Sequence, residues 1–364
     1  MLPVIVLDST ALHGRNSLAG ANVTLLLALA KIGEIRLVVP EVVLLELSRQ
    51  WAEEVESATA GIGRSVGKLN AALRDVGHEP LVVDVTSLDR SVFYDHVSAH
   101  LMGKRVEIIP PPQVSVVDLM HKDLDVRKPF VRTGKGFRDA LTWETIKQLC
   151  SGLADPANLV VFVTDNHTDF CIKENGPLHP DLRAELHPSQ RFDVLPSIKA
   201  LLEHTELDLI VKRFRVLEET FTPTRLLELI DFALSELVGQ EVSDALGVYE
   251  GDGLYSVPIN VGLDGAAFDE IMIDENSIQS DIYRVGKDLT IRVTVETECS
   301  FDGFIDKSDY FVSDDEDGLS LLEDWNDHVF RAGARREVRF TLNGSFTEDT
   351  LDTLSLTVDD AVEI

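Results

Sequence analysis

Short apolar runs and longer stretches with helical spacing alternate along the first 205 residues of the chain. This alternation predicts an α/β unit in which helices flank a parallel sheet. The strand-like runs are PVIVLDS (3–9), IRLVV (35–39), a run that starts at Leu81, VEII (106–109) and LVVFVT (159–164). The predicted helices are 17–31, a long helix opened by Pro40, 86–103, 114–125 and 137–149. In the helix after Pro40 we expect Val43, Leu47 and Trp51, at four-residue steps, to form the buried stripe.

The pattern changes after residue 205. Residues 207–238 have helical spacing with a break at TPT (222–224), and short alternating strands with turn signals begin near residue 247. Such strands predict an antiparallel, sandwich-like all-β domain, in which SDDEDGLSLLEDWND (313–327) is an acidic loop. We therefore divide the chain into an α/β domain at 1–205, a helical connector at 206–246 and a β-domain at 247–364.

Composition narrows the class of protein. The 364 residues are 44% apolar and 26% charged, which favours a folded chain. No apolar run approaches the ~20 residues that cross a bilayer, and the start MLPVIVLDST has no basic leader. We expect neither a membrane segment nor a signal peptide. Cys150, Cys171 and Cys299 are spaced too widely for a zinc motif or a disulfide framework, which favours the reducing cytoplasm.

The formal net charge of −30 is unevenly distributed. Residues 1–200 contain 21 basic and 25 acidic side chains, so residues 201–364 carry a net charge of −26. This asymmetry indicates two domains with different partners. The acidic domain is not expected to attract nucleic acid. We expect it to bind a basic protein, to shield a basic groove of the same chain, or to mediate self-association.

Several acids follow predicted strands or lie on the predicted helices beside them. Asp8 ends the first strand, and Asp165 and Asp169 follow the strand at 159–164. Glu46 lies beside the buried stripe of its helix, and Asp139 falls in the first turn of another helix. Each acid alone could be a helix cap, a turn residue or a solvated side chain. Because the carboxyl ends of parallel strands meet at one sheet edge, the group suits a Mg²⁺ or Mn²⁺ site.

Residues 127–138, RKPFVRTGKGFR, contain five cations and no acid, immediately before Asp139. A cluster of acids repels a polyanion, whereas cations bind phosphates by displacing counterions. We expect a phosphate-binding strip formed by Arg127, Lys128, Arg132, Lys135 and Arg138. Phe130 and Phe137 could stack on bases, although both more often anchor a loop or a core. The alternative for the strip is an ordinary solvated loop.

Three other motifs lack the context that their chemistry requires. GIGRSVG (61–67) does not follow a strand, as a dinucleotide-binding loop would. His96 and His100 are four residues apart, but Val97 replaces the glutamate of the helical zinc-protease motif. Thr10 stands where phosphatases with an aspartyl nucleophile carry their second acid.

The ordered motifs VIVLDST, VVPEVVLLEL, GKGFRDALTW and VVFVTDNHTDF resemble those of PIN-domain nucleases over roughly residues 1–200. The resemblance is greatest to a PIN-like subgroup that carries an RKPF…GKGF-D-AL-W segment. The four acids of the family correspond to Asp8, Glu46, Asp139 and Asp169. Asp165 and Asn166 lie beside the last of these, and many relatives carry an acid where this chain has Asn166.

The resemblance implies a metal-dependent endonuclease, with RNA favoured over DNA as its substrate, although the sequence does not distinguish the two. One or two Mg²⁺ or Mn²⁺ ions, held by these acids with Asp165 as a further ligand, would activate water for attack on a phosphodiester. The product would carry a 5′-phosphate and a 3′-hydroxyl. The family includes the toxins of bacterial toxin–antitoxin pairs, so a toxin or defence role is expected. The alternatives are an inactive PIN-like binding or scaffold protein and a different phosphoester hydrolase.

Overall fold

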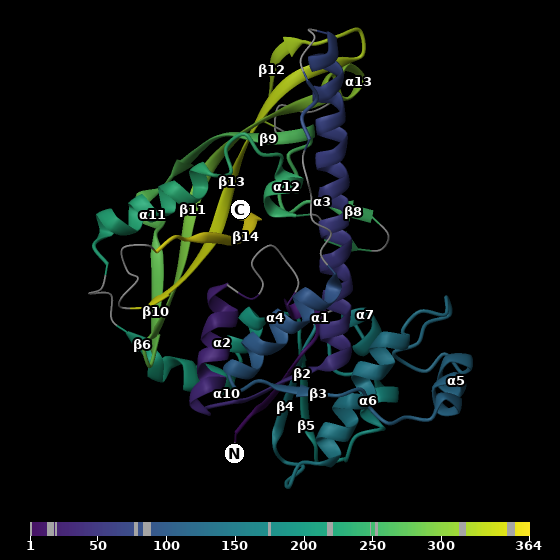
Figure 1. Ribbon diagram of the computed structural model, residues 1–364. Helices are drawn as coiled ribbons and strands as arrows, with labels where there is room; N and C mark the ends of the chain where they lie inside the picture. The colour runs from purple at the N-terminus through teal and green to yellow at the C-terminus, as the bar shows by residue number, and fades with distance from the viewer. Residues whose placement is uncertain are drawn as a thin grey trace. The chain divides into compact units, whose positions relative to one another are not determined.

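The computed structural model in Figure 1 describes residues 2–12, 18, 20–75, 79–82, 89–173, 176–216, 221–247, 249–251, 254–312, 318–347 and 354–364. These residues form two units. One consists of Met1–Ser17 and Leu26–Ile210, and the other of Leu18–Leu25 and Val211–Ile364. No helix among the described residues has the length and apolar character needed to cross a membrane.

The first unit contains a five-stranded sheet in the order β3-β2-β1-β4-β5. Its strands, all parallel, are β1 (Val4–Leu7), β2 (Arg36–Pro40), β3 (Glu107–Ile109), β4 (Leu159–Val163) and β5 (Arg191–Leu195). The central strands β1 and β4 are buried along their whole length, which explains their continuous apolar sequences. The predicted α/β unit with a parallel sheet is thus confirmed.

Helices cover both faces of this sheet (Figure 1). The helices along this part of the chain are α1 (Ser9–Leu12), α2 (Ala21–Ile32), α3 (Glu41–Asp75), α4 (Arg90–Gly103), α5 (Val116–Leu124), α6 (Phe137–Ser151), α7 (His167–Phe170), α8 (Pro180–Arg183), α9 (Ile198–Leu202) and α10 (Thr205–Val211). On one face, Val4 and Val6 pack in a core with Trp143 of α6. Ile5 and Leu7 point to the opposite face and are also fully buried.

The structure corrects three details of the predicted elements. Pro40 is the last residue of β2, so α3 begins one residue later, at Glu41. Residues 79–82 form no strand, and 83–88, the rest of the strand expected after Leu81, lie outside the described residues. Strand β5 was not predicted, because its partly exposed edge position gives RFDVL no continuous apolar signature.

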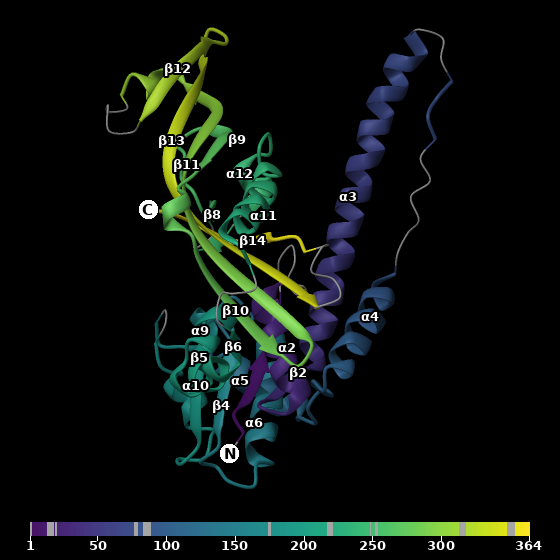
Figure 2. The ribbon, with the colours of Figure 1, turned by 90° about the vertical axis from the view of Figure 1, so that its left-hand side faces the viewer.

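The long helix α3 packs on the core only through its first part. Val43 and Leu47 are buried as predicted, and Trp51 is half-buried against Phe93 of α4, with ring centroids 5.4 Å apart. Beyond Trp51 the helix continues past the end of α4 (Figure 2). GIGRSVG (61–67) lies inside this helical extension, so it is not a phosphate-binding loop.

The second unit contains a seven-stranded antiparallel sheet. Its strands are β6 (Arg215–Val216), β9 (Asp264–Ile273), β10 (Gln279–Val285), β11 (Asp288–Asp306), β12 (Leu319–Asp324), β13 (Val329–Thr347) and β14 (Thr357–Glu363). The two 19-residue strands β11 and β13 pair along their full length, from Asp288↔Thr347 to Asp306↔Val329. A separate hairpin joins β7 (Tyr249–Gly251) to β8 (Leu254–Ser256).

Three helices accompany this sheet: α11 (Pro223–Ser235), α12 (Val242–Leu246) and α13 (Lys307–Tyr310). Two 3₁₀ turns lie at Lys212–Phe214 and Glu275–Ser277. Leu226, Ile230 and Leu234 of α11 pack into one core with Ile291 and Phe340 of the sheet. The all-β antiparallel character is confirmed, but helix α11 packs on this sheet, where a sandwich would have a second sheet.

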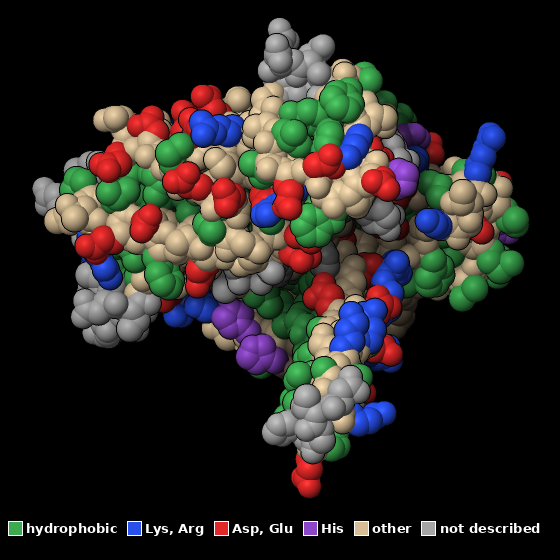
Figure 3. All heavy atoms as spheres, turned by 90° about the horizontal axis from the view of Figure 1, so that it is seen from above, with side chains coloured by type: hydrophobic (Ala, Val, Ile, Leu, Met, Phe, Trp, Pro, Cys, Tyr) green, Lys and Arg blue, Asp and Glu red, His purple; other side chains and the backbone are tan. Residues whose placement is uncertain are grey.

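Two segments of the second unit differ from their predicted conformation. Arg215–Val216, inside the stretch expected to be helical, pairs with β10 as strand β6. Within the expected acidic loop, Leu319–Asp324 forms strand β12 at the edge of the sheet, because its backbone pairs with β13. Residues 313–317 of that loop lie outside the described residues. Asp and Glu side chains are scattered over the face seen in Figure 3.

Candidate active site

Asp8 leaves the sheet at the carboxyl end of β1, beside the end of β4. Its amide donates to the carbonyl of Val163 at 3.0 Å, which extends the β1–β4 ladder by one residue. Asp8 as a residue is only 6% exposed, and its carboxylate accepts hydrogen bonds from Thr164 Oγ1 at 2.6 Å and Thr10 Oγ1 at 3.2 Å. Burial raises the pKa of Asp8, and nearby Glu46 adds to the shift, while the threonine hydrogen bonds oppose it.

Glu46 reaches the same sheet edge from α3. It is half-buried, and Ser9 Oγ donates to its Oε2 at 3.2 Å. The other carboxylate oxygen, Oε1, forms an ion pair with the guanidinium of Arg138, the residue before Asp139. A glutamate beside the buried stripe of α3 is thus held next to Asp8, as the helical geometry predicted.

Asp139 lies in the first turn of α6 and shows that the four predicted acids are close together. Burial raises its pKa from 3.8 to about 6, with further contributions from the charges of Asp169, Asp8 and Glu46, in that order. Only the hydrogen bond from Asn166 opposes the shift. Asp139 of α6 is therefore within electrostatic range of three other carboxylates, which come from the end of β1, from α3 and from α7.

Asn166 joins two of these acids. Its Nδ2 lies 3.1 Å from Oδ1 of Asp139 and 3.0 Å from Oδ2 of Asp169. The opposite oxygen of Asp169 lies 3.7 Å from Nζ of Lys128, which also donates to the carbonyl of Thr168 at 2.7 Å. The sequence placed Asn166 beside the site, but its bridging role depends on a spatial arrangement that sequence does not reveal.

Asp165 occupies the same loop with a different orientation. Its amide donates to Thr10 Oγ1 at 2.9 Å, while its side chain is exposed. Among the described residues, no hydrogen bond or ion pair connects the Asp165 carboxylate to the other acids. The structure brings Asp8, Glu46, Asp139 and Asp169 together and leaves Asp165 at the margin.

The chemistry of these donors fits a hard divalent cation. Carboxylate oxygens are the preferred ligands of Mg²⁺ and Mn²⁺, and mutual repulsion of the acids favours added positive charge. In the described residues, however, no three His, Cys, Asp or Glu side chains are positioned together as ligands. Asn166, Lys128 and Arg138 instead bind the carboxylates. A cation at this site would replace some of these contacts.

The basic loop before α6 is fixed by its own core. Phe130 is buried with Leu119 and Ala140 and anchors the loop, whereas Phe137 is 55% exposed and so does not anchor it. Gly136 has a φ of +107°, and a Cβ there would lie 2.6 Å from the carbonyl of Pro129. Only glycine fits this approach. The loop lines a pocket of about 520 Å³, formed by Gly134, Lys135, Gly136, Phe137, Arg138, Asp139 and Asp169.

The five cations of the loop divide into two groups. Lys128 and Arg138 contact Asp169 and Glu46, as described above. Arg127, Arg132 and Lys135 are exposed, and Arg127 forms a loose 3.6 Å ion pair with the exposed Asp125. The strip therefore compensates the charge of the acids and also presents cations to solvent, of which Lys135 lines the pocket.

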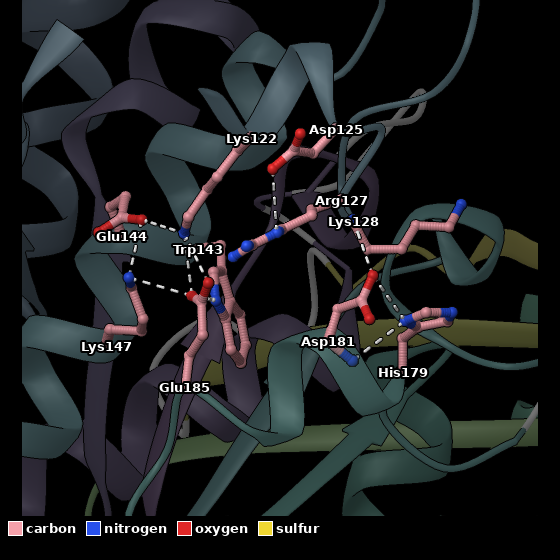
Figure 4. Close-up of polar contacts among 10 residues, drawn as sticks. All are labelled: Lys122, Asp125, Arg127, Lys128, Trp143, Glu144, Lys147, His179, Asp181 and Glu185. Carbon is pink, nitrogen blue, oxygen red and sulfur yellow. Dashed lines mark hydrogen bonds and ion pairs between the residues drawn. The ribbon is translucent and has the colours of Figure 1, made fainter. Parts of the chain in front are cut away.

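A buried ion-pair network supports this arrangement (Figure 4). Lys122 of α5 and Lys147 of α6 each contact Glu144 and Glu185 at 2.7–3.0 Å. The indole of Trp143 donates to Glu185 at 2.9 Å. Burial favours a higher pKa for Glu185, but the donors from Lys122, Trp143 and Lys147 hold its pKa below the ordinary value. The network joins α5, and with it the basic loop, to the helix that carries Asp139.

The first unit thus combines a parallel five-stranded sheet with a group of four acids near the carboxyl ends of its strands. Residues 5–170 match the family model of the PIN domain, and this span includes all four acids. The N-terminal region of the chain is therefore a PIN-like domain. PIN domains are generally nucleases and typically use divalent metals. No curated protein and no solved structure matches the chain.

Proposed function

We propose that the PIN-like domain, residues 1–205, is an endonuclease that depends on Mg²⁺ or Mn²⁺ and hydrolyses RNA. The observation that carries this proposal is the position of Asp139. Its carboxyl is close enough to Asp169, Asp8 and Glu46 for their charges to raise its pKa. A fold gains no stability from four acids that repel one another. Such a cluster is better explained by a function that needs a cation.

Asp8, Asp139 and Asp169, with Glu46, would hold the cation. When bound, Mg²⁺ or Mn²⁺ would polarise the scissile phosphate and lower the pKa of an attacking water. The chain's own groups orient the acids. Thr164 and Thr10 fix the Asp8 carboxylate, Asn166 sets the spacing of Asp139 and Asp169, and Ser9 positions Glu46.

The exposed loop cations would bind the substrate backbone. Lys135 lines the pocket, and Arg127 and Arg132 are exposed cations of the same basic loop, so the loop carries positive charge where the acids alone would repel a polyanion. Phe137 lines this pocket and is 55% exposed, so it offers a face on which an unpaired base can stack. These features favour a single-stranded substrate, and the family resemblance favours RNA over DNA.

For the whole protein we propose a toxin or defence effector of the cytoplasm. The three buried, unpaired cysteines agree with a reducing compartment. The acidic second unit would serve for protein contact or self-association, because its charge disfavours nucleic acid. A second candidate is an inactive PIN-like scaffold. It is supported by the ion pairs of Arg138 and Lys128, which already compensate Glu46 and Asp169.

One assay separates the two candidates. End-labelled single-stranded RNA and DNA are incubated with the full chain, with and without Mn²⁺, beside Asp139→Asn. The control is Asp95→Asn, which removes an exposed carboxylate from α4. We expect Mn²⁺-dependent RNA cleavage that Asp139→Asn abolishes and Asp95→Asn retains. If Asp139→Asn cleaves like the wild type, or no nucleic acid is cleaved under any condition, the nuclease proposal fails.

A further inference from the structure

Arg138 binds one acid of the candidate active site from an exposed position. Its side chain is 52% exposed, whereas the side chain of Glu46 is only 16% exposed. Among the described residues, Glu46 is the one polar partner of the Arg138 guanidinium. The ion pair therefore joins a largely buried acid to a solvent-accessible cation, and an anion from solution can reach the guanidinium before it reaches the acid.

The other ion pair between the basic loop and the acids is held differently. Nζ of Lys128 lies 3.7 Å from Oδ1 of Asp169 and also donates to the carbonyl of Thr168 at 2.7 Å. The Lys128 side chain is 22% exposed. Its backbone partner keeps Lys128 in place even when the contact to Asp169 is lost. In the described part of the chain Arg138 has no such second partner, so it is the loop cation that can exchange its carboxylate for another anion.

Arg138 also lines the pocket of about 520 Å³ beside the acids. The pocket is formed by loop residues 134–138 together with Asp139 and Asp169, and Glu46 is not part of its lining. A phosphate in this pocket therefore meets two cationic residues, Arg138 and Lys135. A guanidinium binds a phosphate with the same two-point geometry that it uses for a carboxylate. Phosphate in the pocket thus competes with Glu46 for Arg138.

Loss of Arg138 leaves Glu46 without a compensating charge. Burial is the main cause of the raised pKa of Asp8 and of Asp139, and the charge of Glu46 adds to both shifts, so Glu46 lies within electrostatic range of both acids. Its other printed contact is the neutral hydroxyl of Ser9, at 3.2 Å. A largely buried carboxylate released beside two other acids is stabilised by a cation. Phosphate binding at Arg138 and cation binding at Glu46 therefore favour each other.

We propose that Arg138 couples substrate binding to cation binding, an inference that rests on the proposed nuclease function. In the free protein the guanidinium occupies Glu46, and in the described chain no three acids are positioned together as ligands. A phosphate of single-stranded RNA takes the guanidinium and frees Glu46 to bind Mg²⁺ or Mn²⁺. The complete set of acids thus becomes available when substrate is present. By linkage, RNA and the cation raise each other's affinity by the same factor.

Mn²⁺ affinity in the absence of nucleic acid tests one half of this exchange. Electron paramagnetic resonance measures free Mn²⁺ in the full chain for the wild type, Arg138→Gln, Glu46→Gln and the double variant. We expect Arg138→Gln to bind Mn²⁺ about fivefold more tightly than the wild type, because Glu46 loses its competing cation. In the Glu46→Gln background the same change frees no carboxylate, so this gain should be absent.

Two further variants separate the ion pair from general charge. Arg132→Gln is the matched control, because it removes an exposed cation of the same loop that has no carboxylate partner in the described residues. Arg138→Lys keeps a cation beside Glu46 and should bind Mn²⁺ like the wild type. Equal gains in Arg132→Gln and Arg138→Gln, or a gain in Arg138→Gln that persists without Glu46, would overturn the proposal.

RNA affinity in EDTA tests the other half. Binding of labelled single-stranded RNA is followed by fluorescence anisotropy in the metal-free full chain. We expect Glu46→Gln to bind RNA about fivefold more tightly than the wild type, because Arg138 is then free for phosphate. The gain should disappear in Glu46→Gln/Arg138→Gln. Asp165→Asn, which removes an exposed acid from the margin of the site, is the control, and an equal gain there would contradict the exchange.

The outcomes distinguish this coupling from the nuclease function itself. A wild type that cleaves RNA with Mn²⁺, while Arg138→Gln gains no Mn²⁺ affinity, overturns the coupling and leaves the nuclease proposal intact. A chain in which neither the wild type nor any variant binds Mn²⁺ overturns both.

Discussion

Nδ2 of Asn166 lies 3.1 Å from Oδ1 of Asp139. This amide donor stands between two carboxylates of the candidate active site and neutralises part of their repulsion. In Asn166→Asp the donor becomes another carboxylate. We expect the metal-free protein to lose about 1–3 kcal/mol of unfolding free energy at pH 7.5, because a buried hydrogen bond is lost and like charge is added.

The same variant should bind Mn²⁺ at least tenfold more tightly, since a further oxygen ligand enters the site. Urea denaturation with EDTA and with Mn²⁺ measures both effects. Asn276→Asp, in an exposed turn of the second unit, is the matched control. Unchanged Mn²⁺ affinity in Asn166→Asp would show that the acids around Asp139 do not bind metal.

Asp139 should make the stability of the metal-free protein depend on pH. Its pKa is about 6 in the folded chain and 3.8 as an ordinary carboxyl, so the folded state holds the proton more tightly. The stability that Asp139 contributes is therefore fully present below about pH 4 and is lost as the pH rises through about 6. Asp139→Asn, which cannot ionise, should exceed the wild type by about 2 kcal/mol at pH 7.5 and match it near pH 4.

Thermal unfolding in EDTA at pH 4, 5, 6 and 7.5 measures this difference, with Asp95→Asn as control. A wild type that gains stability over Asp139→Asn as the pH rises would contradict the assignment of Asp139 as a strained carboxylate.

Asp169 and Asp165 should differ in their effect on activity. Asp169 shares Asn166 with Asp139, whereas Asp165 is exposed and makes no contact with the other acids in the described part of the chain. We expect Asp169→Asn to lower Mn²⁺-dependent RNA cleavage by about a hundredfold or more, as loss of a metal ligand does. Asp165→Asn should lower it by less than about threefold. Single-turnover cleavage rates of the two variants measure this difference. Equal losses of rate in Asp169→Asn and Asp165→Asn would indicate that Asp165 is also a metal ligand.

The exposed loop cations should affect binding rather than chemistry. In Arg132→Gln/Lys135→Gln, the slope of log affinity against log salt should decrease by about 1.4, or 0.7 for each lost phosphate contact on a single strand. The loss should be similar for different RNA sequences. Fluorescence anisotropy at several salt concentrations measures it. Lys173→Gln/Lys199→Gln removes the same charge elsewhere in the domain, and an equal change there would refute a specific role of the loop.

Lys122 should stabilise the helix that carries Asp139. In Lys122→Met, Glu144 and Glu185 retain Lys147 as their remaining cation. Loss of one partner from a buried network costs about 3–5 kcal/mol when nothing replaces it, so a loss of about 2 kcal/mol is expected here. Chemical denaturation followed by circular dichroism tests this, with Lys199→Met as control. Wild-type stability in Lys122→Met would mean that the network contributes little.

Much of the first unit follows from local sequence patterns. VIVL and LVVFV are apolar at every position, a pattern typical of a central parallel strand that is buried on both faces. Because the first of these strands ends just before Asp8, the sequence also places Asp8 at the carboxyl edge of the sheet. Strand β5 escaped prediction because an exposed edge needs no such pattern. Likewise, strand β6 is two residues long and exists only because β10 pairs with it.

The sequence predicted which acids form the candidate site, but it did not predict the side chains that contact those acids. Strand ends and helical periodicity bring Asp8, Glu46 and Asp139 to one edge. The distances from Asn166 to two carboxylates, and the choice of Lys128 and Arg138 as ion-pair partners, depend on loop conformations. The different exposure of Phe130 and Phe137 could not be predicted from the sequence either. Both are aromatic residues of one loop, yet one is buried and the other exposed, because only Phe130 meets Leu119 and Ala140.

The continuous pairing of β11 with β13 has a mechanical consequence for the second unit. Strands β9 and β12 attach at one end of this pair, and β10 and β14 attach toward the other. In the part of the sheet that the structure describes, the short β6–β10 pair is the one ladder that involves neither long strand, and β10 itself attaches to β11. A cut or an inserted proline in β11 or β13 therefore disturbs a strand on which several others depend for their pairing.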